Sequence, residues 1–121
     1  MENIVNKFPY WFAPCFAKYA GRENSMPFDQ HYLMALIAPK KISVLTAKED
    51  AWADAEAQYL CTEATSPIYE KMGLIGLDRS SGLLQTGDES IKGNIVIRMR
   101  EGRHRFFPED WAFFIDSVVN K

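Results

Sequence analysis

Two short apolar segments on either side of a long helical stretch most strongly limit the folds open to this 121-residue chain. Residues 41–47 are β-branched and almost uncharged, which is typical of a strand covered on both faces. Residues 94–100 alternate apolar and polar side chains, which is typical of an edge strand. Parallel neighbours need a long crossover, so the helical connection favours parallel pairing. The sequence therefore predicts an α/β fold, with about two adjacent parallel strands packed with three to four helices.

The expected helices follow from apolar spacing and from the positions of proline and glycine. We expect one helix over residues 26–37, and a crossover made of a helix over 52–65 and a separate shorter helix over 66–73. Residues 74–93 hold four glycines and predict a long loop. A final helix begins at Pro108, where acidic residues follow in the first turn. Its apolar residues recur at helical spacing: Trp111, Phe114, Ile115, Val118 and Val119.

Composition restricts the classes of protein to which the chain can belong. Hydrophobic residues make up 47% of the chain, as in a globular domain, and a net charge of -2 argues against a nucleic-acid-binding protein. The first residues lack the apolar core of a signal peptide, and no apolar run could span a membrane. Cys15 and Cys61 form no CxxC motif and are expected to be free thiols. The chain as written therefore predicts a cytoplasmic protein without metal, cofactor, membrane or nucleic-acid partner.

An acid and a histidine follow the two expected strands. Asp50 comes after residues 41–47, and His104 comes after residues 94–100, across a turn at Gly102. The carboxyl ends of parallel strands meet at one edge of a sheet, so we expect these side chains within reach of a hydrogen bond. Acid before histidine is also the order of the second and third members of an α/β-hydrolase triad. The serine that precedes them, on a Gly-x-Ser-x-Gly elbow, would lie before Met1. This order predicts a single partial domain over residues 1–121, the carboxyl-terminal portion of an α/β-hydrolase fold.

Three spaced segments resemble one esterase family. They are Phe8-Pro9-Tyr10-Trp11-Phe12, then Pro27-Phe28-Asp29-Gln30-His31 leading into Ala35-Leu36-Ile37-Ala38-Pro39, and Glu49-Asp50-Ala51-Trp52-Ala53-Asp54. The turn Gly102-Arg103-His104 and the final Asp110-Trp111 continue the match. Together they resemble the carboxyl-terminal part of bacterial glucuronoyl esterases and of acetyl-xylan-esterase-like α/β hydrolases.

The resemblance implies a serine esterase that cuts ester bonds of plant-wall carbohydrate, without a cofactor. By the matched segments, His104 corresponds to the general base, Asp50 to a candidate acid, and Trp52 to an aromatic residue near the sugar site. Members of this family are often exported. Since the matched part contains neither the nucleophile nor the oxyanion donors, we expect the chain to be inactive on its own.

Each candidate residue also has a plainer interpretation. His104 could be a solvated loop histidine, Asp50 a helix-capping acid, and Trp52 a core residue. His31 is expected to pack inside its helix rather than to act as a base or ligand. Four arginines surround the second strand and could bind the carboxylate of a uronic acid, but we favour a solvated edge face. They are Arg98, Arg100, Arg103 and Arg105.

Three functions remain open at this stage. The first is the carboxyl-terminal portion of an esterase, either a truncated reading frame or one piece of a split enzyme. The second is a non-catalytic remnant that binds or oligomerises through an exposed sheet edge, with the aromatic segment 8–19 in the contact or folded over the sheet. The third is an independent small enzyme with its own serine, although Ser80 and Ser81 lie in no Gly-x-Ser-x-Gly motif.

Overall fold

A three-stranded mixed sheet forms the centre of the molecule. The computed structural model describes residues 2–80, 82 and 85–119. Strands β1 (Ile42–Ala47) and β3 (Ile95–Arg100) run parallel and are adjacent, with Ile42 opposite Ile95 and Ala47 opposite Arg100. Strand β2 (Glu89–Ser90) pairs antiparallel on the other side of β3, so the order is β1-β3-β2. The predicted parallel pair is confirmed.

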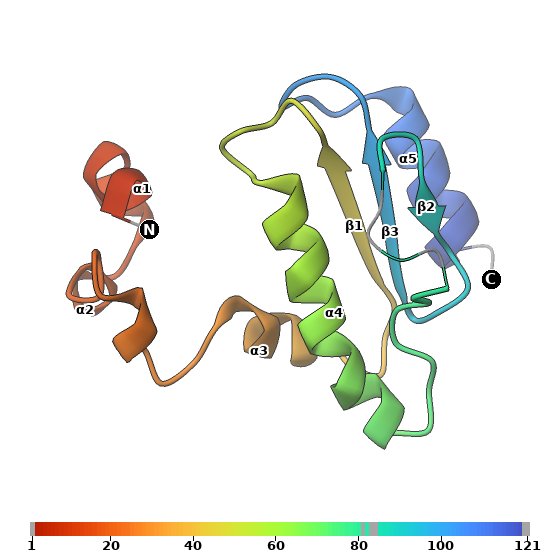
Figure 1. Cartoon of the computed structure of the whole chain (residues 1–121), viewed down its shortest axis with the longest axis horizontal. Coiled ribbons are helices and arrows are strands. Elements are labelled where there is room, and N and C mark those ends of the chain that lie inside the picture. The colour runs from red at the N-terminus through yellow and green to blue at the C-terminus, as the bar shows by residue number, and fades with distance from the viewer. Residues whose placement is uncertain (1, 81, 83–84, 120–121) are drawn as a thin grey trace.

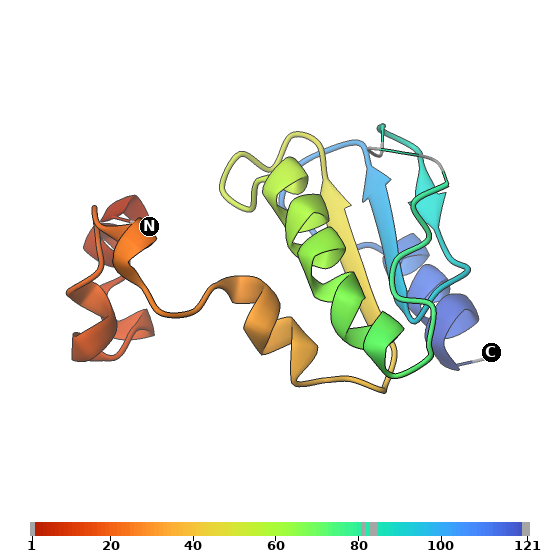
Figure 2. The same ribbon diagram turned by 60° about the horizontal axis from the view of Figure 1, so that its bottom comes forward.

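Helices cover the two faces of this sheet and make three layers. Helix α4 (Ala55–Lys71) lies on one face, and α5 (Pro108–Phe114) lies on the other, continued by the π-helical turn η3 (Ile115–Val119) (Figures 1 and 2). The buried core lies between α4 and the sheet and consists of Ile42, Tyr59, Tyr69, Leu77, Ile95, Ile97 and Met99. This packing fixes the strand ends on which the candidate site depends. The predicted α/β layering, with helices packed on a parallel strand pair, is confirmed.

The prediction that residues 94–100 form an edge strand was wrong. Strand β3 is the central strand, and Ile95, Val96 and Ile97 are fully buried. Its second neighbour is β2, a strand of two residues within the segment expected to be a loop. A strand this short carries no periodic pattern, and the alternation in β3 arises because Arg98 and Arg100 face α5 and hydrogen-bond there.

The predicted break in the crossover at Ser66-Pro67 is absent. Helix α4 is continuous, with the exposed Pro67 in its interior. Proline has no N–H to donate to the carbonyl four residues earlier, which belongs to Glu63. Arg79 instead donates to that carbonyl from the following loop, at 3.4 Å. A contact from outside the helix thus satisfies the group that proline leaves free.

The final helix begins at Pro108 as predicted, but its apolar stripe is not its buried face. Asp110, Phe113 and Ser117 are buried, whereas Trp111 is 58% exposed and Ile115 is 45% exposed. The face of α5 that contains Asp110 packs on the sheet, because Arg100 of β3 forms an ion pair with Asp110 there.

The N-terminal segment consists of short helices. They are α1 (Glu2–Lys7), η1 (Pro9–Trp11), α2 (Pro14–Ala17), η2 (Glu23–Ser25) and α3 (Gln30–Ala35). Helix α3 packs on α4 but is shorter than the helix expected over residues 26–37, because Asp29 caps it. The part before α3 stands away from the sheet in both views (Figures 1 and 2), so residues 8–19 do not fold over it.

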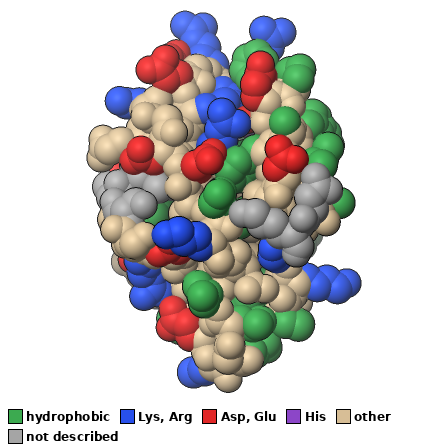
Figure 3. Space-filling model, turned by 90° about the vertical axis from the view of Figure 1, so that its right-hand side faces the viewer, with side chains coloured by type: hydrophobic (Ala, Val, Ile, Leu, Met, Phe, Trp, Pro, Cys, Tyr) green, Lys and Arg blue, Asp and Glu red, His purple; other side chains and the backbone are tan. Residues whose placement is uncertain are grey.

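The surface over β2 and α5 carries no single-sign charge patch. Acidic and basic side chains are interspersed across this face (Figure 3), which differs from the basic stripe of a nucleic-acid-binding protein. Among the described residues, none of the helices has the length and apolar character needed to cross a membrane.

Candidate active site

The loops that follow β1 and β3 are joined to each other by backbone hydrogen bonds. The amide of Lys48 donates to the carbonyl of Arg100 at 3.0 Å, and the amide of Glu49 donates to the carbonyl of Gly102 at 3.1 Å. The parallel pairing therefore continues past the strand ends. This continuation carries Asp50 and His104 to the same edge of the sheet.

Asp50 and His104 are in direct contact. The Nδ1 atom of His104 lies 2.6 Å from Oδ2 of Asp50, a short hydrogen-bond distance, as expected where one partner is ionised. The Asp50 side chain is 8% exposed and that of His104 is 85% exposed. An ionised carboxylate can only accept, so Nδ1 carries the hydrogen and donates it. In the tautomer that donates from Nδ1, the Nε2 atom of a neutral imidazole carries the lone pair that a general base requires.

The second carboxylate oxygen of Asp50 stabilises the turn that follows β1. Its Oδ1 atom accepts from the backbone amide of Ala53 at 3.2 Å. Burial by itself disfavours the charged form, but the hydrogen bonds from His104 and Ala53 favour it and hold the pKa of Asp50 below its ordinary value of 3.8. Asp50 does not cap a helix, since the residue that caps α4 is Asp54, whose side chain accepts from the amide of Ala57 at 3.1 Å. Asp50 instead holds the turn before α4 with one oxygen and contacts His104 with the other.

Two of the four arginines around β3 are not solvated as the sequence suggested. Arg98 donates to the carbonyl of Glu109 at 3.2 Å, and Arg100 pairs with the buried Asp110 at 3.2 Å. Arg103 and Arg105 are exposed and fit the expectation. Nothing in the sequence distinguished Arg100 from the other three arginines.

Trp52 is not a core residue. Its side chain is 59% exposed, and its ring contacts come from the N-terminal segment. The Lys7 ammonium lies 4.2 Å from the Trp52 ring centroid, and the Phe8 ring lies edge-on at 6.2 Å. Trp11, also exposed, stacks on Phe8 at 4.2 Å. Sequence reasoning missed Lys7 here, because the contact joins segments far apart in the chain.

The remaining candidates have ordinary surroundings. The ring of His31 packs against Tyr32 with centroids 4.3 Å apart, as expected of a packing residue. Cys15 and Cys61 are free thiols. Ser80 donates its amide to Asp78 at 3.0 Å, and Ser81 lies outside the described residues. The described part of the chain holds no group of three or more His, Cys, Asp or Glu residues that could bind a metal.

Parallel strands with helices on both faces have the layering of the α/β-hydrolase fold class, in which an acid and a histidine lie at the carboxyl ends of strands. A family model described as "Glucuronyl esterase, fungi" matches residues 1–73, more than half of the chain. The chain therefore belongs to the glucuronoyl esterase family. The expected resemblance to the carboxyl-terminal part of that family's domain is confirmed.

Curated relatives and solved structures agree with this assignment. A carbohydrate esterase from an unknown prokaryotic organism is 32% identical over 116 residues, which are 96% of this chain and 26% of that protein. A promiscuous CE15 esterase from a marine bacterial metagenome superposes with a TM-score of 0.86 at 33% identity, covering 93% of this chain and 28% of the other. The glucuronoyl esterase from Solibacter usitatus gives 0.85 at 30% identity, covering 95% and 29%. The chain thus spans under a third of the length of these relatives.

Proposed function

We propose that this chain supplies the acid and the general base of a serine esterase site that hydrolyses glucuronoyl esters of plant-wall carbohydrate. The observation that carries the proposal is the 2.6 Å contact between Asp50 Oδ2 and His104 Nδ1 at the carboxyl edge of parallel strands. Membership of the glucuronoyl esterase family supports the substrate class. Curated relatives named 4-O-methyl-glucuronoyl methylesterase, such as that of Sodiomyces alcalophilus at 34% identity over 65 residues, support it further.

The chemistry proceeds through Nε2 of His104. A serine oxygen attacks the ester carbonyl carbon while Nε2 takes the hydroxyl proton, and Asp50 stabilises the imidazolium that forms. The imidazolium returns the proton to the departing alcohol oxygen as the ester bond breaks. Water then repeats the sequence on the acyl-enzyme and releases the uronic acid.

The serine, in this proposal, comes from a part of the fold outside these residues. The support is the share of the relatives that the chain covers, 28% and 29% in the two solved structures above. We therefore infer that the purified chain alone hydrolyses neither a glucuronoyl methyl ester nor an aryl acetate, the latter representing acetyl-xylan-type esters. Loss of a single oxyanion donor costs about a hundredfold in rate, and loss of the nucleophile costs far more.

We further propose that Trp52 contributes to the sugar subsite. Its exposed ring lies under the Lys7 ammonium and contacts Phe8, on which the exposed Trp11 stacks. Aromatic rings with a nearby cation suit the stacking of a carboxylated sugar. The second candidate function is a binding or oligomerising module. It is favoured by one observation, the edge of β1 that has no strand partner among the described residues.

A chimera tests the proposed esterase role. This chain replaces the matching segment of the Solibacter usitatus esterase, and kcat is measured on a glucuronoyl ester. We expect turnover that falls at least about a thousandfold in His104→Ala, with His31→Ala as the matched histidine control that retains the activity. A folded chimera, verified by circular dichroism, whose turnover survives His104→Ala would refute the proposal.

A further inference from the structure

We propose that Arg100 is a positioning residue for His104, because its guanidinium holds the loop that presents the imidazole to Asp50. This inference rests on the proposed function, in which His104 is the general base. The contacts of Arg100 and their difference from those of Arg98 carry it.

One guanidinium binds the carbonyls on both sides of the histidine. Its Nη1 atom donates to the carbonyl of Glu101 at 2.8 Å. Its Nη2 atom donates to the carbonyl of Arg103 at 3.3 Å and to that of Arg105 in a shorter contact. Arg103 and Arg105 are the immediate neighbours of His104. The backbone on both sides of the histidine is thus fixed to a single rigid, planar group.

The guanidinium itself is anchored to the body of the fold. Its Nε atom pairs with Oδ2 of Asp110 at 3.2 Å, with the two side chains 15% and 2% exposed. The same Oδ2 atom accepts from the backbone amide of Phe107 at 2.9 Å, at the start of α5. The guanidinium carbon lies 4.7 Å from the centroid of the Phe107 ring. Arg100 therefore joins the histidine loop to the first turn of α5.

The loop is shaped around this group. Gly102 has a φ of +93°, and a Cβ there would lie 3.3 Å from Nη1 of Arg100. The positive φ favours glycine at this position, and a side chain here would also push the guanidinium by a few tenths of an ångström. His104 is 85% exposed, so packing does little to hold its ring. The backbone contacts with Arg100 are what restrict the positions from which Nδ1 can reach Asp50.

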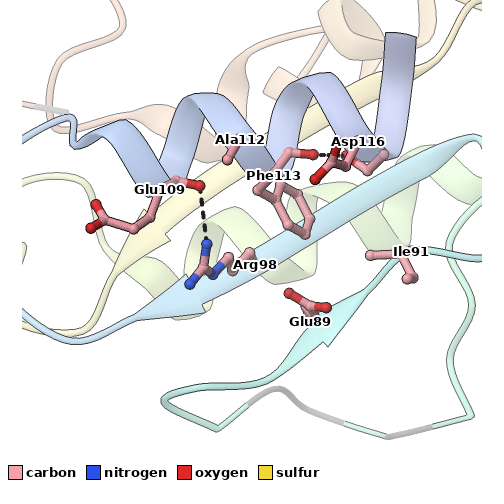
Figure 4. Close-up of a pocket in the computed structure, with 8 residues that line it drawn as sticks. Glu89, Ile91, Arg98, Glu109, Ala112, Phe113 and Asp116 are labelled. Carbon is pink, nitrogen blue, oxygen red and sulfur yellow. Dashed lines mark hydrogen bonds between the residues drawn. The ribbon is translucent and has the colours of Figure 1, made fainter. Parts of the chain in front are cut away.

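A lysine in place of Arg100 could not make the same set of contacts. An ammonium group keeps the positive charge beside Asp110, but it cannot donate in one plane to an acid and to three separate carbonyls. Arg98 provides a matched control, because it lies two residues earlier and projects to the same face of β3. Figure 4 shows it extending from β3 to α5, where it donates to the carbonyl of Glu109 at 3.2 Å, away from the histidine loop.

The test reads the His104 tautomer by ¹⁵N NMR of the imidazole in the full chain at neutral pH. In the parent protein and in Arg98→Lys we expect the Nδ1–H form to dominate. In Arg100→Lys we expect the ratio of the Nδ1–H to the Nε2–H form to fall at least about tenfold, because the ring is no longer held at Asp50. Circular dichroism checks that each variant is folded.

A second variant covers the case in which Arg100→Lys does not fold. Arg100→Met with Asp110→Asn removes both charges of the buried pair and keeps an acceptor for the Phe107 amide, so no charge is left buried alone. We expect the same tautomer shift. A folded variant of either kind that keeps the parent ratio overturns the proposal for Arg100 while leaving the esterase proposal intact. If the parent protein itself lacks the Nδ1–H form, both the proposal for Arg100 and the esterase proposal are overturned.

Discussion

The two carboxylate oxygens of Asp50 have different partners, one in the candidate site and one in a neighbouring turn. Oδ2 meets His104, while Oδ1 holds the turn that leads into α4 through the amide of Ala53. The sequence predicted the first contact because both residues follow strand ends that parallel pairing brings together. It could not predict the role of Arg100, because that role depends on where three loop carbonyls lie in space.

The lowered pKa of Asp50 makes its contribution to stability dependent on pH. A lowered pKa means that the folded state binds the proton less tightly than the unfolded state. The stabilisation is therefore complete above the ordinary value of 3.8 and is lost as the pH falls through the lowered pKa. At pH 7 we expect Asp50→Asn to lower the free energy of unfolding by about 1 kcal/mol, because one partner is solvent-exposed. Urea titrations from pH 7 downwards should show this difference shrinking, and a constant difference at all pH values would contradict the account.

Gly93 is required by a close approach of two backbone segments. A Cβ at this position would lie 1.8 Å from the carbonyl oxygen of Gly76, which is far inside van der Waals contact. We expect Gly93→Ala to lower the free energy of unfolding by about 3 kcal/mol, since backbone must move. Gly73→Ala is the control: its φ of +77° is strained for alanine, but a Cβ meets nothing within 4 Å. The expected cost there is about 1 kcal/mol, and equal costs in denaturant titrations would argue against the clash.

Helix α4 shows how a tertiary contact overrides a local signal. Ser66-Pro67 predicted a new helix start, since proline is favoured in the first turn. The structure keeps one helix because the free carbonyl of Glu63 is bound by Arg79. The parallel crossover was still predictable, because only its length and helical character decide the topology.

This compensation predicts coupling between Pro67 and Arg79. Pro67→Ala restores an amide donor to the Glu63 carbonyl at an exposed position, and we expect it to raise the free energy of unfolding by about 1 kcal/mol. Arg79→Ala should cost less in the Pro67→Ala background than in the parent protein. A double-mutant cycle by thermal denaturation measures this difference. Strict additivity of the two substitutions would contradict the role given to Arg79.

In the described part of the chain, the sheet has an edge without a partner strand. Strand β1 pairs with β3, and on its other side the described residues contribute no strand. A pocket of about 810 Å³ lies beside this strand, lined by apolar residues that include Met34, Val44 and Leu60. The sequence predicted β3 as an edge strand because its apolar and polar residues alternate, and the apolar composition of β1 indicates only that both faces of the strand are covered.

An unpaired apolar edge recruits other strands. We expect the purified chain to form a dimer or a higher assembly at about tens of micromolar, and Val44→Lys at the edge to shift it towards the monomer. Multi-angle light scattering gives the mass of each form. A monomeric parent protein would show that the edge does not recruit a second copy and would remove the oligomerising alternative.

The proposed esterase site requires Asp50 to hold the His104 ring with the hydrogen on Nδ1, so that Nε2 can act as the base. The most direct test of this requirement is the ¹⁵N NMR tautomer of His104 in the parent protein and in Asp50→Asn. We expect the Nδ1–H form in the parent protein. In the variant we expect the Nε2–H form, because the Asn amide can donate to Nδ1. An unchanged tautomer in a folded Asp50→Asn protein would contradict the requirement.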